Sequence, residues 1–247
     1  MSVAWNPWHG CSKYSEGCLN CYVYRIDAAA GRESRQVSLN SSFNLPEKSG
    51  RSGMKIKSGD EVYTCLSSDF FIEEADKWRP RAWEMMAARR DLTFIIITKR
   101  ITRMHLCLPD DWGNGRAYSH IHIGCTCENQ RRADERLPVF LSLPIVHRFI
   151  VCEPLLEKIN LRSYLDRRIE KVIVGGESGE GARVCDYDWV LSIRDDCAAT
   201  GTAFHFKQTG ANFRKGGRVY VIPRKYQLSQ ARAAGIDLPG SVKESSD

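Results

Sequence analysis

Short apolar runs recur along the chain at intervals of roughly 25 to 30 residues, and this rhythm constrains the fold more than any other feature. Most of these runs are apolar on both faces, which is typical of strands in a parallel sheet covered by helices. The predicted strands are residues 3–5, 62–66, 92–98, 121–125, 148–152, 171–174 and 203–206. Alternation of such strands with helices indicates βαβ units, so the predicted class is α/β.

Helical patterns lie between several of these strands. Asp186 is a predicted N-cap for a helix whose apolar residues recur up to Cys197 and which ends at Gly201. Residues 71–78 carry apolar side chains on one helical face before Pro80, where we expect a kink or a fresh start. Residues 129–141 and 160–168 are further predicted helices.

Polar residues follow six of the predicted strands. These residues are Ser67-Ser68-Asp69, Lys99, Cys127-Glu128-Asn129, Glu153, Glu177-Ser178 and Lys207-Gln208. In a (β/α) barrel such carboxyl ends converge on one mouth, whereas a doubly wound sheet would spread them along an edge. We therefore predict a partial or near-complete parallel barrel of six to seven strands over residues 1–210. Residues 31–60 would be a loop or lid, and 211–247 a basic extension with a disordered end.

Ten cysteines occur in a chain whose first residues have no apolar signal-peptide core, so we expect reduced thiols. Cys11, Cys18 and Cys21 form a C-x6-C-x2-C cluster after the first strand. Three thiolates on one loop can bind three irons of a [4Fe–4S] cluster. Structural zinc is an equal alternative from spacing alone, with His9 or Cys185 as the fourth ligand; the thiols could also be unliganded.

The strings WNPWHGCSKYSEGCLNCY, SSDFF, IITKR, CEPLL, VGGESGEGAR and FKQTG extend over most of the chain. Together they resemble a family of phage and bacterial proteins of largely unassigned function, grouped with the radical S-adenosylmethionine superfamily. The resemblance implies a radical-SAM-like barrel and a [4Fe–4S] cluster on the three cysteines. It also implies bound S-adenosylmethionine, cleaved to a 5′-deoxyadenosyl radical that abstracts a hydrogen atom, and an external electron donor.

The remaining polar strand ends are candidate contacts for S-adenosylmethionine or substrate. Ser67 and Asp69 stand where the superfamily commonly receives the methionine ammonium, and Lys99 is a candidate for the methionine carboxylate. Glu128 and Glu153 are candidate contacts for ribose or substrate. Glu177, Lys207 and Gln208 are candidate substrate-binding residues, since a cation and an amide can grip a phosphate, a carboxylate or a base edge.

The charge pattern suggests a substrate class. The net charge is +6, and residues 211–232 carry six Lys and Arg side chains with no Asp or Glu. Phe213, Tyr220 and Tyr226 are interleaved with these cations, which suits a nucleic acid or nucleotide, although a solvated basic face has the same pattern. A peptide or small-metabolite substrate, a zinc-bearing nucleic-acid-binding protein and a barrel enzyme with ordinary acid–base chemistry remain alternatives. No apolar run approaches the roughly 20 residues of a membrane helix, so we expect a cytoplasmic protein.

Overall fold

A computed structural model describes residues 1–51 and 53–240, and its residues divide into two compact units. Among the described residues, the first unit comprises 1–51, 53–125 and 142–147, and the second comprises 126–141 and 148–240. The end of the chain that we predict to be disordered, 241–247, lies outside the described residues. Within those residues, no helix has the length and apolar character needed to cross a bilayer.

The first unit is built on four parallel strands, whose order is β1-β6-β7-β8. They are β1 (Ser2–Trp5), β6 (Glu61–Thr64), β7 (Thr93–Thr98) and β8 (Ile121–Thr126). Their register sets Val62 opposite Phe94 and Phe94 opposite Ile121, all three buried. This row of apolar side chains is the kind of contact that fixes strand register, because a slip by one residue would expose it.

Two helices and several short elements complete the first unit. The helices are α1 (Tyr22–Ala29) and α2 (Arg79–Ala88). The short strands are β2 (Trp8–His9), β3 (Ser38–Leu39), β4 (Ser49–Gly50) and β5 (Gly53–Met54). Six 3-10 turns cover Glu16–Cys18, Leu45–Glu47, Glu73–Ala75, Ile101–Leu106, Asp110–Trp112 and Arg116–Tyr118. The predicted loop or lid, 31–60, therefore contains the pairing of β4 with β5 and also β3, which pairs with β2 outside this segment.

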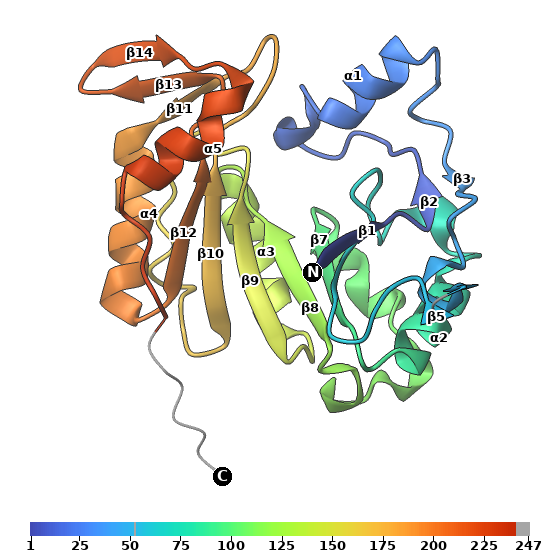
Figure 1. Cartoon of the computed structure of the whole chain (residues 1–247). Helices are drawn as coiled ribbons and strands as arrows, with labels where there is room; N and C mark the ends of the chain where they lie inside the picture. Colours follow the sequence, from blue (N-terminus) through green and yellow to red (C-terminus); the bar gives the residue numbers. More distant parts are fainter. Residues whose placement is uncertain (52, 241–247) are drawn as a thin grey trace. The chain divides into compact units, whose positions relative to one another are not determined.

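The second unit contains three parallel strands in the order β9-β10-β12. They are β9 (His147–Cys152), β10 (Ile169–Gly175) and β12 (Ala203–Gln208), and Figure 1 shows them side by side. Helices α3 (Gln130–Ser142) and α4 (Tyr187–Thr200) belong to this unit. The residues after 210 form β13 (Asn212–Lys215), β14 (Arg218–Val221) and α5 (Arg224–Ala233). A small sheet pairs β11 (Val184–Asp186) with β13, and β13 with β14.

The predicted fold class is confirmed. All seven predicted strands are present among the described residues, and within each unit their spatial order follows the chain. This order is expected of a partial parallel (β/α) barrel, because a doubly wound sheet reverses its strand order at a switch point.

Of the four predicted helices, two form as expected and two are wrong. Asp186 caps α4 by accepting a hydrogen bond from the Asp188 backbone N–H, and Gly201 ends that helix in the left-handed conformation. Residues 129–141 match α3. By contrast, 160–168 form turns, because Asn160 and Asp166 accept the backbone N–H two residues ahead and compete with helical pairing.

The segment before Pro80 also differs from the prediction. Residues 71–78 contain only the 3-10 turn Glu73–Ala75, and α2 begins afresh at Arg79 with Pro80 in its first turn. Proline suits this position because the first N–H groups of a helix have no helical partner. The predicted fresh start at Pro80 is therefore confirmed, and the helix before it is a correction.

Candidate functional site

The three clustered cysteines lie on the loop between β2 and α1 of the first unit. All ten cysteines are free thiols; Cys11, Cys18 and Cys21 are partly exposed, and the other seven are buried. The three thiols of this loop can therefore reach a ligand, whereas the seven buried thiols serve as small apolar side chains.

Arg100 holds the first part of this loop. The arginine is buried just after β7, and its Nη2 donates hydrogen bonds to the Ser12 carbonyl oxygen at 3.0 Å and to Ser12 Oγ at 2.7 Å. Its guanidinium also lies over the Tyr14 ring, 4.6 Å from the centroid. A cation that bonds to a backbone oxygen and stacks on an aromatic face fixes the loop in both position and orientation.

Further bonds tie the loop to the segment that follows β6. The Gly10 N–H donates to the Ser67 carbonyl at 3.2 Å, and the Ser68 hydroxyl donates to the Gly10 carbonyl. Tyr24 donates its hydroxyl proton to the Cys11 carbonyl. Gly10 has φ of +95°, and an added Cβ would lie 2.5 Å from the Gln36 carbonyl oxygen, so this position requires glycine.

Asp69 joins the ends of β6 and β7. Its Oδ1 accepts hydrogen bonds from the Thr98 hydroxyl at 2.8 Å and from the Phe71 N–H at 3.0 Å, and its Oδ2 accepts from the Lys99 N–H at 3.0 Å. The turn that brings it here passes through Cys65, which has φ of +66°. A left-handed non-glycine residue beside a site is a form of strain that the surrounding bonds must maintain.

Lys99 directly follows β7 and is half-buried. Its backbone N–H is bonded to the Asp69 carboxylate, whereas its ammonium forms no ion pair within residues 1–51 and 53–240. An ammonium without an internal counterion can pair with a ligand carboxylate. The first unit therefore brings the cysteine loop, Ser67, Asp69 and Lys99 together.

His9, the alternative zinc ligand, has an internal partner. Its Nε2 lies 2.8 Å from Asp27 Oδ1, and the Ser34 hydroxyl donates to Asp27 Oδ2 at 2.7 Å. Burial alone would raise the pKa of Asp27, but the bonds from Ser34 and His9 outweigh it and lower that pKa. Cys185, the other alternative ligand, is fully buried in β11.

The donor set suits a metal centre, although the loop is not arranged as one in this structure. Among the described residues, no group of three His, Cys, Asp or Glu side chains is grouped closely enough to hold a metal ion. Burial, followed by the charge of Asp69, raises the pKa of Cys11 to about 12, and the Cys18 and Cys21 thiolates contribute in the same direction. A bound metal cation would counter this shift, because it stabilises a thiolate.

In the second unit, two candidate carboxylates are engaged by arginines. Glu128 is completely buried, and its Oε2 lies 2.8 Å from Arg136 Nη1. Glu177 accepts the Arg183 backbone N–H and Nε, each at 2.9 Å, and pairs with the same guanidinium through its other oxygen. A ligand could use either carboxylate only by displacing its arginine.

Three other candidates of the second unit form one cluster at the carboxyl ends of β9 and β12. Glu153 Oε2 accepts from Lys207 Nζ at 2.7 Å, and Glu153 Oε1 accepts from Gln208 Nε2 at 2.6 Å. Lys207 is exposed and Glu153 is partly exposed. Gly176, in the neighbouring glycine pair, allows close packing, since an added Cβ would lie 2.2 Å from the Thr209 carbonyl oxygen.

Sequence reasoning did not predict how the cysteine loop is held: Arg100 and Tyr24 are not among the predicted site residues, and Ser68 is predicted only as a polar strand end without a role. Arg100 and Ser68 stand inside the strings IITKR and SSDFF, next to residues that we singled out for ligand binding. Their partners are backbone carbonyls distant in sequence, so spacing along the chain carries no signal for these bonds.

Fold and site together define an α/β protein whose first unit carries a three-thiol loop beside polar side chains at parallel strand ends. A family model described as "Protein of unknown function (DUF5131)" matches residues 1–245, and the chain belongs to this family. Searches of curated proteins and of solved structures returned no match.

Proposed function

We propose that this protein is a radical S-adenosylmethionine enzyme in which Cys11, Cys18 and Cys21 bind a [4Fe–4S] cluster. The observation that carries the proposal is the separation of thiols: three partly exposed ones share a fastened loop, and seven are buried elsewhere. Three ligands on one loop leave the fourth iron to an exogenous molecule. A closed zinc site would need a fourth protein ligand, and both candidates for that role are engaged or buried.

The chain's own residues would position S-adenosylmethionine. The Asp69 carboxylate has about four lone-pair sites, of which three are used, so one remains for the methionine ammonium. Ser67 offers a hydroxyl oxygen beside it, and the Lys99 ammonium would bind the methionine carboxylate. A cluster held by Cys11, Cys18 and Cys21 would supply one-electron reduction chemistry: an electron from an external donor would cleave S-adenosylmethionine to methionine and a 5′-deoxyadenosyl radical, which would abstract a substrate hydrogen atom.

The roles of the second unit in this proposal concern the substrate and the ribose. Glu153 and Glu128 are proposed ribose or substrate contacts, and Glu177, Lys207 and Gln208 are proposed substrate contacts. Of these, the Glu153, Lys207 and Gln208 cluster is accessible, since Lys207 is exposed. An anionic or amide-bearing substrate group would exchange with the Lys207–Glu153 pair.

The test is anaerobic purification and iron–sulfide reconstitution, followed by electron paramagnetic resonance of the dithionite-reduced protein with and without S-adenosylmethionine. We expect a reduced [4Fe–4S] signal that changes on adding S-adenosylmethionine, and 5′-deoxyadenosine detected by chromatography. The Cys18→Ala variant should lose both while keeping its circular dichroism spectrum. Cys197→Ala is the matched control, because it removes a buried thiol from α4 and introduces a good helix former. Stoichiometric zinc without a cluster signal would overturn the proposal.

A further inference from the structure

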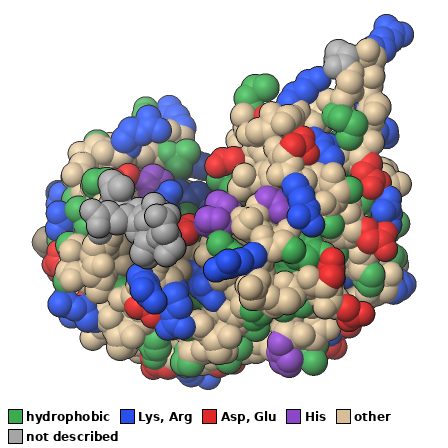
Figure 2. All heavy atoms as spheres, turned by 90° about the horizontal axis from the view of Figure 1, so that it is seen from below, with side chains coloured by type: hydrophobic (Ala, Val, Ile, Leu, Met, Phe, Trp, Pro, Cys, Tyr) green, Lys and Arg blue, Asp and Glu red, His purple; other side chains and the backbone are tan. Residues whose placement is uncertain are grey.

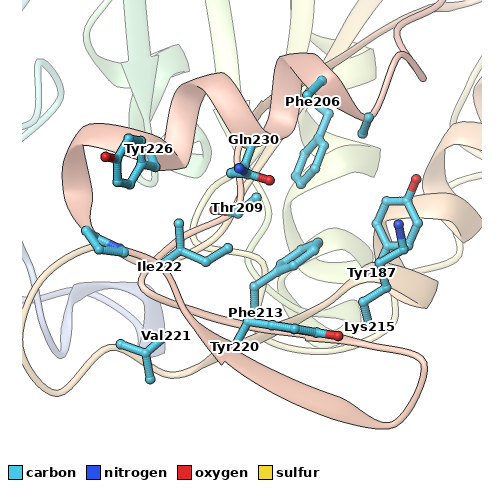
Figure 3. A pocket seen from close by; sticks show the side chains of 13 residues that line it. Tyr187, Phe206, Thr209, Phe213, Lys215, Tyr220, Val221, Ile222, Tyr226 and Gln230 are labelled. Atoms are coloured by element: carbon cyan, nitrogen blue, oxygen red, sulfur yellow. The ribbon is translucent and has the colours of Figure 1, made fainter.

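The second unit has a cavity of about 440 Å³ between α5 and the small sheet of β11, β13 and β14 (Figure 3). This volume is within the range of small-ligand sites. Five aromatic side chains line it: Tyr187, Phe206, Phe213, Tyr220 and Tyr226. Each ring comes from a different element: the first residue of α4, then β12, β13, β14 and α5. The cavity therefore depends on the fold of residues 184–234 and not on one loop.

The cavity wall consists of ring faces and edges. Phe206 and Phe213 are stacked with centroids 5.9 Å apart, and Tyr187 meets Phe213 edge-on at 5.7 Å. Figure 3 shows Gln230 of α5 close to these rings, supplying an amide. No acidic side chain lines the cavity within the described residues. A wall of rings with a few hydrogen-bonding groups suits a flat, polar-edged ligand such as a nucleobase.

Three cations lie over rings that line the cavity, and one of the three, Lys215, also lines the cavity itself. The Lys215 ammonium is 4.8 Å from the Tyr187 centroid, and the Lys225 ammonium is 4.8 Å from that of Tyr226. The Arg218 guanidinium is 5.1 Å from the Tyr220 centroid. These three cations form no ion pair with an acid in the part of the chain that the structure describes. The face drawn in Figure 2, in contrast, intersperses Lys and Arg with Asp and Glu.

Exposed apolar surface adjoins these cations. Every residue of β14 is exposed, including Val221 at 80%, and Tyr226 and Leu228 of α5 are about half exposed. A purely solvated basic face has no need of rings and apolar groups on its surface. Charge complementarity selects a polyanion as the occupant, and the rings select one with unpaired bases.

We propose that this cavity binds an unpaired base of a single-stranded nucleic acid, while Lys215, Arg218 and Lys225 contact the flanking phosphates. Tyr220 and Tyr226, at the edge of the cavity, stack on the base or its neighbour. The inference deepens the proposed function by naming its substrate class, and it rests on that function only for the chemistry that follows binding. The binding step needs no cluster, so it can be measured separately.

The experiment is fluorescence anisotropy of a labelled 20-nucleotide single strand of mixed sequence, with the full chain before and after reconstitution. A duplex of the same sequence is the comparison. We expect the single strand to bind more tightly than the duplex, and three phosphate contacts should give a slope of log K against log salt near −2. Tyr220→Ala should weaken binding by roughly 5- to 100-fold, whereas Tyr220→Phe should retain it, because the ring supplies the stacking. Arg218→Gln should weaken binding and flatten the salt slope, whereas Lys158→Gln, an exposed cation elsewhere in this unit, should do neither.

Equal affinity for duplex and single strand, together with a silent Tyr220→Ala variant, would overturn the inference and leave only a solvated basic face. A correctly folded chain that binds no single strand would also overturn the inference. The same holds if this surface proves to bind a protein and no nucleic acid. The two proposals fail separately. A chain that binds single strands through Tyr220 but forms no 5′-deoxyadenosine refutes the radical chemistry alone, and the converse result refutes this inference alone.

Discussion

Asp69 offers the sharpest test of how the site is built. It accepts three hydrogen bonds, of 2.8, 3.0 and 3.0 Å, while being only 6% exposed. Asn has one acceptor oxygen, so in Asp69→Asn the amide NH₂ must face at least one N–H or O–H donor. Losing one hydrogen bond to a buried charged acceptor costs about 1.5–3 kcal/mol. We therefore expect the free energy of unfolding to fall by about 2 kcal/mol in Asp69→Asn and by about 4 kcal/mol in Asp69→Ala, which leaves several donors unsatisfied.

The assay is thermal and urea unfolding without S-adenosylmethionine, so that any role in ligand binding does not enter. For a chain of this size, about 2 kcal/mol corresponds to a midpoint lowered by roughly 4–8 °C. Glu33→Gln is the control, since Glu33 is exposed and bonded only to a nearby backbone N–H, and it should change stability by less than about 0.5 kcal/mol. If Asp69→Asn unfolds at the wild-type temperature, the carboxylate does not join the two strand ends and our reading of the site is wrong.

Three further predictions follow from packing, burial and thiol exposure. Gly176→Ala should destabilise the chain by about 3 kcal/mol, because the new Cβ would lie 2.2 Å from the Thr209 carbonyl oxygen; Gly50→Ala, whose nearest atom is at 3.8 Å, should be nearly neutral in the same melt. Burial lowers the pKa of His120 below 6.5, so the unfolded chain binds more protons and stability should fall as pH drops through 6.5 toward the lowered value. Urea unfolding at several pH values should show this slope reduced in His120→Gln and kept in the exposed variant His105→Gln; an unchanged slope in the first would refute the assignment. Finally, a chromogenic disulfide should label Cys18 and Cys21 quickly in the metal-free native chain, Cys11 more slowly because its raised pKa disfavours the thiolate, and the other seven cysteines only on unfolding; fast labelling of any of those seven would contradict the burial pattern.

The strand rhythm could be read from the sequence because strands buried on both faces must be apolar throughout. The polar residues that follow six of the strands can be identified in the sequence in the same way, which is why Asp69, Lys99 and Glu153 could be predicted as site residues. The hydrogen-bond and ion-pair partners of these polar residues cannot be predicted from the sequence. Glu128 and Glu177 are each paired with an arginine, and neither the partner nor its geometry follows from spacing.

Local competition explains the wrong helix. Residues 160–168 have helical spacing of apolar side chains, but Asn160 and Asp166 satisfy nearby N–H groups and convert the segment into turns. The aromatic cavity could not be predicted from the sequence either. Its cations and rings at 213–226 were visible in the chain, but Tyr187 and Phe206 join them only through the pairing of β13 with β11 and the packing of α5 on β12.

The manner in which the cysteine loop is fastened has a consequence for how such proteins diversify. Arg100, Ser68 and Tyr24 all donate to main-chain oxygens of the loop, at Ser12, Gly10 and Cys11. A main-chain oxygen is the same whatever side chain its residue carries, so these three bonds do not depend on the identity of the accepting residues, whereas the contacts of Arg100 with Ser12 Oγ and the Tyr14 ring do. Selection acting on this loop therefore has to preserve its length, its glycine and the two side chains that Arg100 contacts, Ser12 and Tyr14. The bonds to main-chain oxygens place no such demand on the side chains of the residues that accept them.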